Sequence, residues 1–237
     1  MNQTIDIEEI KEKLYEQLKP SGWGIKLRSF IFSSDFDNIL LQLIKQTKEG
    51  KRFTPKIKQL FRAFEECPYN ELKVVIVSQD PYPQLGVADG IAFSCGNTKE
   101  VQPNLKYIQN AILNTVYSEE GCAFDKDLKR LSNQGILLLN TALTTTINRI
   151  GQHYMLWKPF LAYLFDFLTW NNNGLVYIYM GKKATEWQTA TNDNNYKLMC
   201  LHPASAAYNS SETWDCNDVF NKTSKIIKDN YNFEINW

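Results

Sequence analysis

The hydrophobic pattern of the chain is dominated by four short apolar runs, each of which ends abruptly in polar residues. The first run, residues 72–77, is rich in β-branched residues and is followed by Ser78-Gln79-Asp80-Pro81-Tyr82-Pro83. Runs of this length and composition predict buried strands. By the same criteria we expect further strands at residues 135–139, 175–180 and 197–201.

Segments with apolar residues at helical spacing surround and separate these strands. We expect helices at residues 7–18, 35–48, 55–67, 103–116 and 158–170, one that opens at residue 181, and a last one that carries residues 219–227. Strands that alternate with helices predict an α/β fold. The sequence therefore predicts a short central parallel sheet of about four strands, flanked by helices.

The composition indicates one domain, because 237 residues, 43% of them hydrophobic, can bury a core of ordinary size. We expect this domain to cover residues 1–237, with a helical amino-terminal flank at 1–52. The acidic residues near the amino terminus argue against a secretory signal, and no run of about 18 apolar residues predicts a membrane span. We therefore expect a soluble, intracellular, cytoplasmic protein.

Cysteine, histidine and charge content disfavour several other classes. Five scattered cysteines without a C-x-x-C motif argue against a disulfide framework, an iron-sulfur cluster and a zinc site. Only two histidines are present, so we expect neither a metal nor a cofactor. The 26 basic and 26 acidic residues cancel, so no global positive field indicates a nucleic-acid partner, and only a local basic patch stays open.

Each predicted strand is followed by one conspicuous residue. These are Asp80, Asn140, Gly181 and His202. The carboxyl ends of parallel strands meet at one edge of a sheet, where α/β folds bind ligands, so we expect the four residues to share that edge. A plainer interpretation stays open, because Asp-Pro is a common turn former and a polar residue often only ends a strand.

Three common α/β chemistries lack their motifs. No G-x-G-x-x-G follows a strand, and no G-x-S-x-G occurs. Gly181-Lys182 is similar to the end of a phosphate-binding loop, but the glycine that this motif requires five residues earlier is Val176. Dinucleotide, nucleoside-triphosphate and serine-hydrolase chemistry therefore lose support.

Several motifs, in order and in register, resemble those of family 1 uracil-DNA glycosylases. They are Gln79-Asp80-Pro81-Tyr82, Gly90-Ile91-Ala92-Phe93-Ser94, Pro103-Asn104-Leu105, Leu137-Leu138-Leu139-Asn140-Thr141 and His202-Pro203. The resemblance covers roughly residues 53–229, the motif-bearing core. It implies the fold of that family and an activity that excises uracil from DNA and leaves an abasic site.

This reaction breaks an N-glycosidic bond through a transition state that separates a cationic sugar from an anionic base. By resemblance, Asp80 positions and activates the attacking water, and its charge lies near the cationic sugar. His202 would donate a hydrogen bond to uracil O2 as negative charge grows there. On residue type alone, His202 could equally be a turn residue at the end of a strand.

The resemblance implies four residues that contact uracil. Asn140 would accept from N3–H and donate to O4, a pattern that cytosine reverses. Phe93 would stack on the flipped base, Tyr82 would exclude the thymine methyl group, and Gln79 would orient the base. Aromatic residues at strand ends are usually core residues, and this interpretation stays open for Phe93 and Tyr82.

The implied partner is uracil-containing DNA, single- or double-stranded. Backbone N–H groups at a helix opening are free to meet a phosphate. The DNA-contacting residues implied by the resemblance are Pro103, Asn104, Gly181, Lys182, Pro203, Ala204, Ala206 and Tyr208. The family is also compatible with a proteinaceous glycosylase inhibitor as a partner. We expect a monomer that does not contact a membrane.

The sequence departs from the family pattern at positions near the target. Ser78 replaces a glycine, Pro83 and Asp89 replace histidines, and Asn104 replaces a serine. We therefore expect the contacts with the DNA phosphates near the target uracil to differ from those of the family.

Two later departures concern DNA as well. The family has Gly-Ser where this chain has Gly181-Lys182, and we hypothesise that Lys182 or Lys183 makes a charged phosphate contact. The alternative is that both lysines are only solvated. The family also carries a leucine wedge where this chain has Ala206, which cannot fill the gap left by a flipped base. We therefore expect a preference for single-stranded DNA, unless Tyr208 takes the wedge role.

Two other functions stay open. A non-catalytic protein on the same fold could bind uracil-containing DNA, although binding alone does not need the carboxylate of Asp80. A glycosylase for another damaged base is the closer rival. The intact Tyr82, Phe93 and Asn140 favour uracil.

Overall fold

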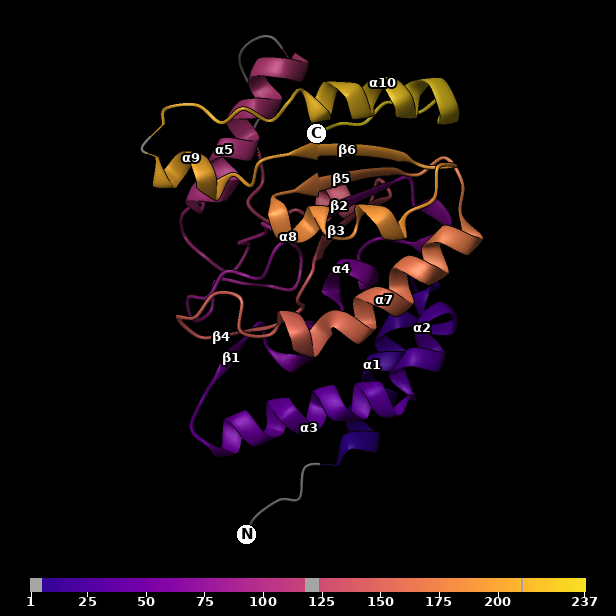
Figure 1. The fold of residues 1–237 in the computed structure, drawn as a ribbon, viewed down its shortest axis with the longest axis vertical. Coiled ribbons are helices and arrows are strands. Elements are labelled where there is room, and N and C mark those ends of the chain that lie inside the picture. Colours follow the sequence, from indigo (N-terminus) through magenta and orange to yellow (C-terminus); the bar gives the residue numbers. More distant parts are fainter. Residues whose placement is uncertain (1–5, 118–123, 210) are drawn as a thin grey trace.

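A computed structural model describes residues 6–117, 124–209 and 211–237, and its centre is a four-stranded parallel sheet (Figure 1). In spatial order the strands are β3 (Ile136–Asn140), β2 (Val74–Ser78), β5 (Val176–Met180) and β6 (Tyr196–Cys200). Every residue of β2, β3 and β5 is buried, whereas β6 at the edge is partly exposed. The predicted α/β fold is confirmed, with each strand within two residues of its expected bounds.

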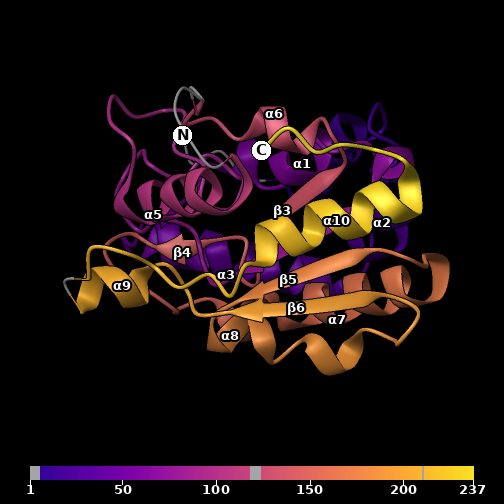
Figure 2. The same ribbon diagram turned by 90° about the horizontal axis from the view of Figure 1, so that it is seen from above.

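Helices cover both faces of this sheet (Figure 2). On one face lie α5 (Pro103–Ile112) and α10 (Val219–Tyr231), and on the other lie α7 (Tyr154–Asn171) and α8 (Lys182–Thr185). Successive residues of a strand point to opposite faces. Tyr177 and Tyr179 of β5 therefore stack against Phe165 of α7, while Met180 points to the α5 side.

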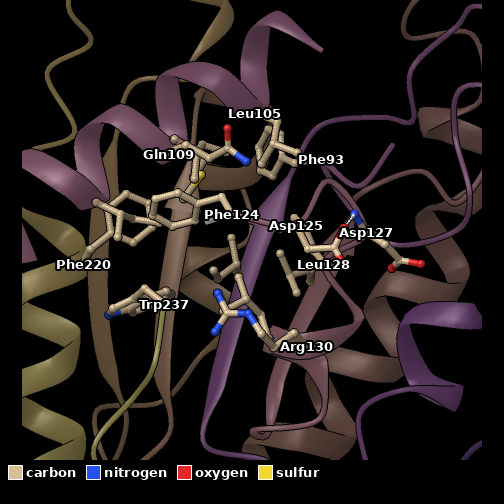
Figure 3. Close-up of a pocket in the computed structure, with 16 residues that line it drawn as sticks. Phe93, Leu105, Gln109, Phe124, Asp125, Asp127, Leu128, Arg130, Phe220 and Trp237 are labelled. Atoms are coloured by element: carbon tan, nitrogen blue, oxygen red, sulfur yellow. Dashed lines mark hydrogen bonds between the residues drawn. The ribbon is translucent and has the colours of Figure 1, made fainter. Parts of the chain in front are cut away.

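On the α5 side, apolar side chains enclose a small cavity between the sheet, α5 and the carboxyl terminus (Figure 3). Phe93 lines this cavity together with Leu105 of α5, and Phe220 and Trp237 line it from α10 and the last residue. The loop that carries Phe93 is thus packed directly on the core.

The amino-terminal helices extend the same core. They are α1 (Ile7–Leu18), α2 (Trp23–Ile31) and α3 (Ser34–Lys48). The side chains of Asp6 and Ser33 cap α1 and α3 by accepting backbone N–H groups of the first turn. Phe30 of α2 packs against Phe160 of α7, with ring centroids 5.2 Å apart. None of the helices in the described part of the chain is long and apolar enough to span a bilayer.

Several local elements differ from the sequence expectation. Residues 55–67 form a 3₁₀ turn (Ile57–Gln59) followed by α4 (Arg62–Glu65), and α5 ends at Ile112 in a π-helical turn (Leu113–Tyr117). α7 begins four residues before its predicted start. The sequence does not mark this start, because no side chain caps the amino terminus of the helix. The pattern did not predict α2, α6 (Lys129–Ser132), α9 (Ala204–Tyr208), or the two-stranded pair β1 (Phe53–Thr54) and β4 (Thr145–Thr146).

Candidate active site

The carboxyl ends of the sheet strands border a cleft of about 530 Å³. It lies between the neighbouring strands β2 and β5. The chain leaves β2 toward β3 on one side and leaves β5 toward β6 on the other, and α/β folds bind ligands where the strand order reverses in this way. The predicted site residues that line it are Gln79, Asp80, Tyr82, Phe93, Pro103, Asn104, Gly181, Lys182, His202 and Ala204. The structure thus brings together residues from five separate segments of the chain.

Asp80 is held in a largely desolvated position at the end of β2. Its Oδ2 accepts the backbone N–H of Gly151 at 3.0 Å, and its Oδ1 accepts the hydroxyl of Tyr154 at 2.7 Å. Burial raises the pKa of Asp80, and these hydrogen bonds oppose the rise because they stabilise the charged form. The carboxyl group is therefore fixed on both oxygens and is more basic than an exposed aspartate.

His202 is neutral and presents a defined N–H donor. Its Nδ1 accepts the backbone N–H of Ala204 at 3.1 Å, so the ring proton of the neutral imidazole is on Nε2. Burial lowers the pKa of His202 to about 4. Nε2 lies 3.4 Å from Ser78 Oγ, a weak contact that leaves the donor available to a ligand.

Asn140 is buried beside this imidazole and does not form part of the cleft wall. It pairs with Ser78 in the β2–β3 ladder, and register partners project from the same face of a sheet, the face on which Ser78 meets His202. Its Oδ1 is buried and has no hydrogen-bond partner among the described residues. Buried acceptors are rarely unpaired, so this oxygen is an open position for a donor on a ligand.

Two aromatic residues complete the pocket. Phe93 has a φ of +65°, a left-handed conformation that is strained for an aromatic residue, and its ring lies 5.5 Å from the His202 ring at a tilt of 39°. The hydroxyl of Tyr82 donates to the carbonyl of Phe93 at 3.3 Å. This bond and the cavity packing (Figure 3) hold a strained backbone that aims the Phe93 ring at the imidazole.

Gly181 is required where β5 meets α8. Its φ is +89°, and a Cβ at this position would lie 2.8 Å from His202 Cβ and 3.0 Å from Gln79 Nε2. Real Cβ atoms do not approach other atoms this closely, so the glycine lets two site residues pack against the backbone.

The rim of the cleft is formed by α8 and α9. Lys182 is exposed, lines the cleft and makes no ion pair within the described residues, whereas Lys183 pairs with Glu186 at 2.7 Å. In α9, Ala206 is only 5% exposed and packs inward. The residue of α9 next to it, Ala207, is exposed and lines the cleft. The expected DNA contact of Ala206 at the wedge position stays a prediction.

Pro203 and Tyr208 are two further expected DNA contacts in this loop. Pro203 is buried and does not line the cleft. The side chain of Tyr208 lies outside the described part of the structure, so its proposed wedge role stays a prediction.

Asp89, one of the departures from the family pattern, has a structural role. It is 1% exposed and accepts from Arg62 Nη1 at 2.9 Å, from Ser94 Oγ at 2.6 Å and from two backbone N–H groups. Arg62 also bridges to Asp127 at 2.7 Å. The network braces the loop that carries Phe93 and faces the protein interior.

Sequence analysis missed Gly151 and Tyr154, which hold Asp80. They lie 71 and 74 residues after it, and no motif marks them, so only the fold brings them together. In the described ranges, no group of three or more acidic, histidine or cysteine side chains could hold a metal ion.

The sequence is similar to one family of known proteins. Residues 64–228 match the model of the uracil DNA glycosylase superfamily. A uracil-DNA glycosylase of Acinetobacter baylyi is 31% identical over 234 residues, which cover 97% of each chain. A uracil-DNA glycosylase of Mesomycoplasma hyopneumoniae is 32% identical over 204 residues, 84% of this chain and 89% of that one.

Solved structures show the same architecture. Mimivirus uracil-DNA glycosylase superimposes with a TM-score of 0.81 at 22% identity, over 94% of this chain and 88% of that one. A mimivirus UNG Y322F variant in complex with UGI gives 0.80 at 23% identity, over 91% and 87%. With a family model over most of its length and relatives above 30% identity, the chain belongs to the uracil-DNA glycosylase family.

Proposed function

We propose that this protein hydrolyses the N-glycosidic bond of deoxyuridine in DNA, releasing uracil and leaving an abasic site. The observation that carries the proposal is the pairing of a fixed, partly buried carboxylate at Asp80 with a neutral Nε2–H donor at His202 in one cleft. The reaction develops positive charge on the sugar and negative charge on the base, and these two groups match the two charges.

In the proposed reaction, Asp80 acts on the sugar side. Its carboxylate accepts a hydrogen bond from the attacking water, orients it toward the anomeric carbon and takes its proton, while the negative charge stabilises the cationic sugar. The bond between the sugar and the base breaks, and its electron pair leaves with uracil. The raised pKa of Asp80 makes it a stronger base than an exposed carboxylate.

His202 acts on the base side as a neutral donor. A hydrogen bond from Nε2 to uracil O2 becomes stronger as negative charge gathers on that oxygen. A pKa of about 4 keeps the imidazole neutral at neutral pH, so the bond provides a dipole without adding a second buried charge.

Specificity for uracil rests on the open acceptor of Asn140. Its Oδ1 can take the N3–H of uracil, and its amide N–H can reach O4, whereas cytosine presents an acceptor at N3. If the edge of the bound base does not match the Asn140 side chain, buried polar groups stay without hydrogen-bond partners. The free-energy cost of these unpaired groups excludes the wrong base. Phe93 provides the stacking surface, Tyr82 would occupy the space beside C5, and Gln79 would orient the base.

The experiment is release of free uracil from a single-stranded oligonucleotide with one deoxyuridine, with the thymine analogue as a substrate control. Asp80→Asn should lower the rate by at least about 100-fold, the usual contribution of a general base. Asp193→Asn is the matched control, because Asp193 is exposed and its one ion pair among the described residues is with Lys197.

Each outcome separates the candidate functions. Uracil release that falls in Asp80→Asn and not in Asp193→Asn supports the proposal. Tight binding without release would make the protein a reader of uracil-containing DNA, and release of a different base would make it a glycosylase of other specificity.

Three narrower points are proposed on the same grounds. We propose uracil-containing DNA as the partner, a monomer as the working state, and one domain over residues 1–237 with a helical flank at 1–52. Two similar mimivirus structures are complexes with UGI, which supports a proteinaceous inhibitor as a second partner. Inhibition of uracil release by UGI, measured in the same assay, tests that last point.

A further inference from the structure

The carboxylate of Asp80 is held from one side by a single segment of the chain. Gly151 N–H donates to Oδ2 at 3.0 Å, and the hydroxyl of Tyr154 donates to Oδ1 at 2.7 Å. Two donors on two different oxygens fix the plane of a carboxyl group as well as its position. The remaining lone pairs of Asp80 stay open to the cleft.

The backbone of this segment is shaped to receive the tyrosine ring. Gly151 has a φ of +75°, and a Cβ there would lie 2.9 Å from Tyr154 Cε2. The glycine therefore makes room for the ring and supplies the second donor. Asn148 N–H also bonds to the carbonyl of Pro83 at 2.9 Å, which ties the segment to the loop that follows Asp80.

We propose that Tyr154 is a positioning residue for the uracil excision proposed above, which holds the Asp80 carboxylate in the orientation that directs its free lone pairs to the attacking water. The inference rests on that function. Tyr154 touches Asp80 and does not line the substrate cleft, so it acts through the carboxylate rather than on the substrate.

The charged groups around Asp80 and Tyr154 leave the hydroxyl of Tyr154 protonated, so that it can donate a hydrogen bond. Burial and the charge of Asp80 raise the pKa of Tyr154. On α8, Lys183 lies 5.7 Å from the centre of the Tyr154 ring and is paired with Glu186, while Lys182 and His202 border the cleft. The hydroxyl of Thr145 in β4 donates to the carbonyl of Arg149 at 2.6 Å. Tyr154 is therefore the donor to Oδ1 throughout the range in which Asp80 ionises.

The test is Tyr154→Phe, which removes the hydroxyl and keeps the ring. We expect kcat for uracil release to fall by about 10- to 100-fold with little change in KM, because misplaced catalytic groups lose rate rather than affinity. The charged form of Asp80 loses a donor, so its pKa rises and the acid limb of the pH–rate profile moves up by about one pH unit.

The matched control is Tyr163→Phe. Tyr163 lies on the same helix, and its hydroxyl donates to the carbonyl of Lys26 at 2.8 Å, away from Asp80. This variant should keep both the rate and the pH profile of the parent. Equal effects of the two substitutions would overturn the proposal.

A double substitution tests whether the tyrosine acts through Asp80. In an Asp80→Asn background, Tyr154→Phe should add no further loss of rate, since the group that it positions is no longer a carboxylate. A further loss of the same size as in the parent would show a separate role and reject the inference.

A measurement without turnover separates this inference from the proposed function. The carboxyl pKa of Asp80, followed by carbon NMR in the free protein, should be higher in Tyr154→Phe than in the parent. An unchanged pKa would contradict the positioning bond even if the protein excises uracil. A parent protein that releases no uracil, with the pKa shifted as expected, would overturn the proposed function and with it the catalytic part of the inference, while the bond itself would stand.

Discussion

At the scale of single residues, the site is built from groups whose hydrogen bonds are only partly satisfied within the protein. Asn140 Oδ1 is buried without a partner, and His202 Nε2 has only a weak contact with Ser78. Each unmet bond costs stability in the free protein. The protein therefore holds these groups in position before the substrate binds, so the hydrogen-bonding partners of the base are preorganised.

The partly buried imidazole of His202 makes stability depend on pH. Its pKa is about 4 in the folded protein and rises toward the ordinary value of 6.5 on unfolding. Below pH 6.5 the unfolded chain binds a proton that the folded protein does not, so stability falls as the pH drops toward 4. From pH 7 to 5 this residue alone should cost about 2 kcal/mol.

Urea unfolding at pH 7 and pH 5 measures this effect. The parent protein should lose more stability between the two pH values than His202→Asn, by about 2 kcal/mol. An equal loss in both proteins would show that His202 keeps its ordinary pKa in the folded state.

Gly181→Ala tests how closely the site residues are packed. The added methyl group would collide with His202 and Gln79, so we expect uracil release to fall by about 100-fold, with a loss of about 1–3 kcal/mol in stability. Gly50→Ala is the control, because Gly50 has a similar φ of +79° and no atom within 4 Å of the added Cβ. A rate that falls equally in both variants would attribute the effect to backbone strain alone.

At the scale of elements, the short helices α8 and α9 decide what the cleft rim offers to DNA. α8 places Lys182 over the cleft and turns Lys183 toward Glu186. α9 places Ala207 at the rim and Ala206 in the core. The described residues of α9 that line the cleft are small: Ala204, Ser205 and Ala207.

Lys182→Ala should weaken binding to DNA and flatten its dependence on salt. A lysine that neutralises a phosphate releases a counterion, so its loss changes the slope of log K against log salt by about one unit or slightly less. Lys183→Ala, which removes a lysine already paired with a carboxylate, should leave the slope nearly unchanged. Titrations of a fluorescent abasic oligonucleotide at several salt concentrations measure both, and equal slopes for Lys182→Ala and the parent would reject the contact.

The small residues of α9 lead us to expect faster uracil release from single-stranded than from double-stranded DNA of the same sequence. Unstacking a base costs a few kcal/mol that a wedge normally offsets. Ala207→Leu should narrow the difference between the two substrates, whereas Ala206→Leu should mainly destabilise the protein by overpacking. Equal rates on both substrates in the parent would contradict this expectation.

Many residues of the rim and of the site could be predicted from the sequence. The other residues depend on contacts between distant parts of the chain, which no local sequence pattern predicts. Strands were predicted well because each short apolar run is rich in strand-forming residues and ends abruptly in polar ones. Asp80 and His202 were predicted to share one sheet edge because each follows such a strand, and their roles were implied by the family resemblance. Tyr154 and the inward turn of Ala206 were not, since one depends on a contact across 74 residues and the other on how a single turn docks.

At the scale of the whole molecule, a buried ionic network links the Phe93 loop to the core. Arg62 pairs with Asp89 and Asp127, and Asp89 is 1% exposed. Removing one partner of a buried pair strands the other charge. The network therefore contributes to the position of Phe93 as well as to stability.

Arg62→Met should lower the free energy of unfolding by about 3–5 kcal/mol, because Asp89 would be left buried without its cation. Lys197→Met, which breaks a pair with the fully exposed Asp193, should cost less than about 1 kcal/mol. Urea denaturation at neutral pH compares the two. Similar small losses in both would mean that the pair of Arg62 and Asp89 does not stabilise the folded protein.

The order of the strands has a consequence for synthesis of the protein. Asp80 is attached to the first sheet strand and His202 to the last, so 121 residues separate the two groups that the reaction needs, and most of the sheet lies between them. A nascent chain cannot assemble the cleft until β6 has left the ribosome and joined β5. Fragments that end before residue 196 should therefore hold no half-active site, and the protein becomes competent to cut bases out of DNA only after β6 and His202 have been made.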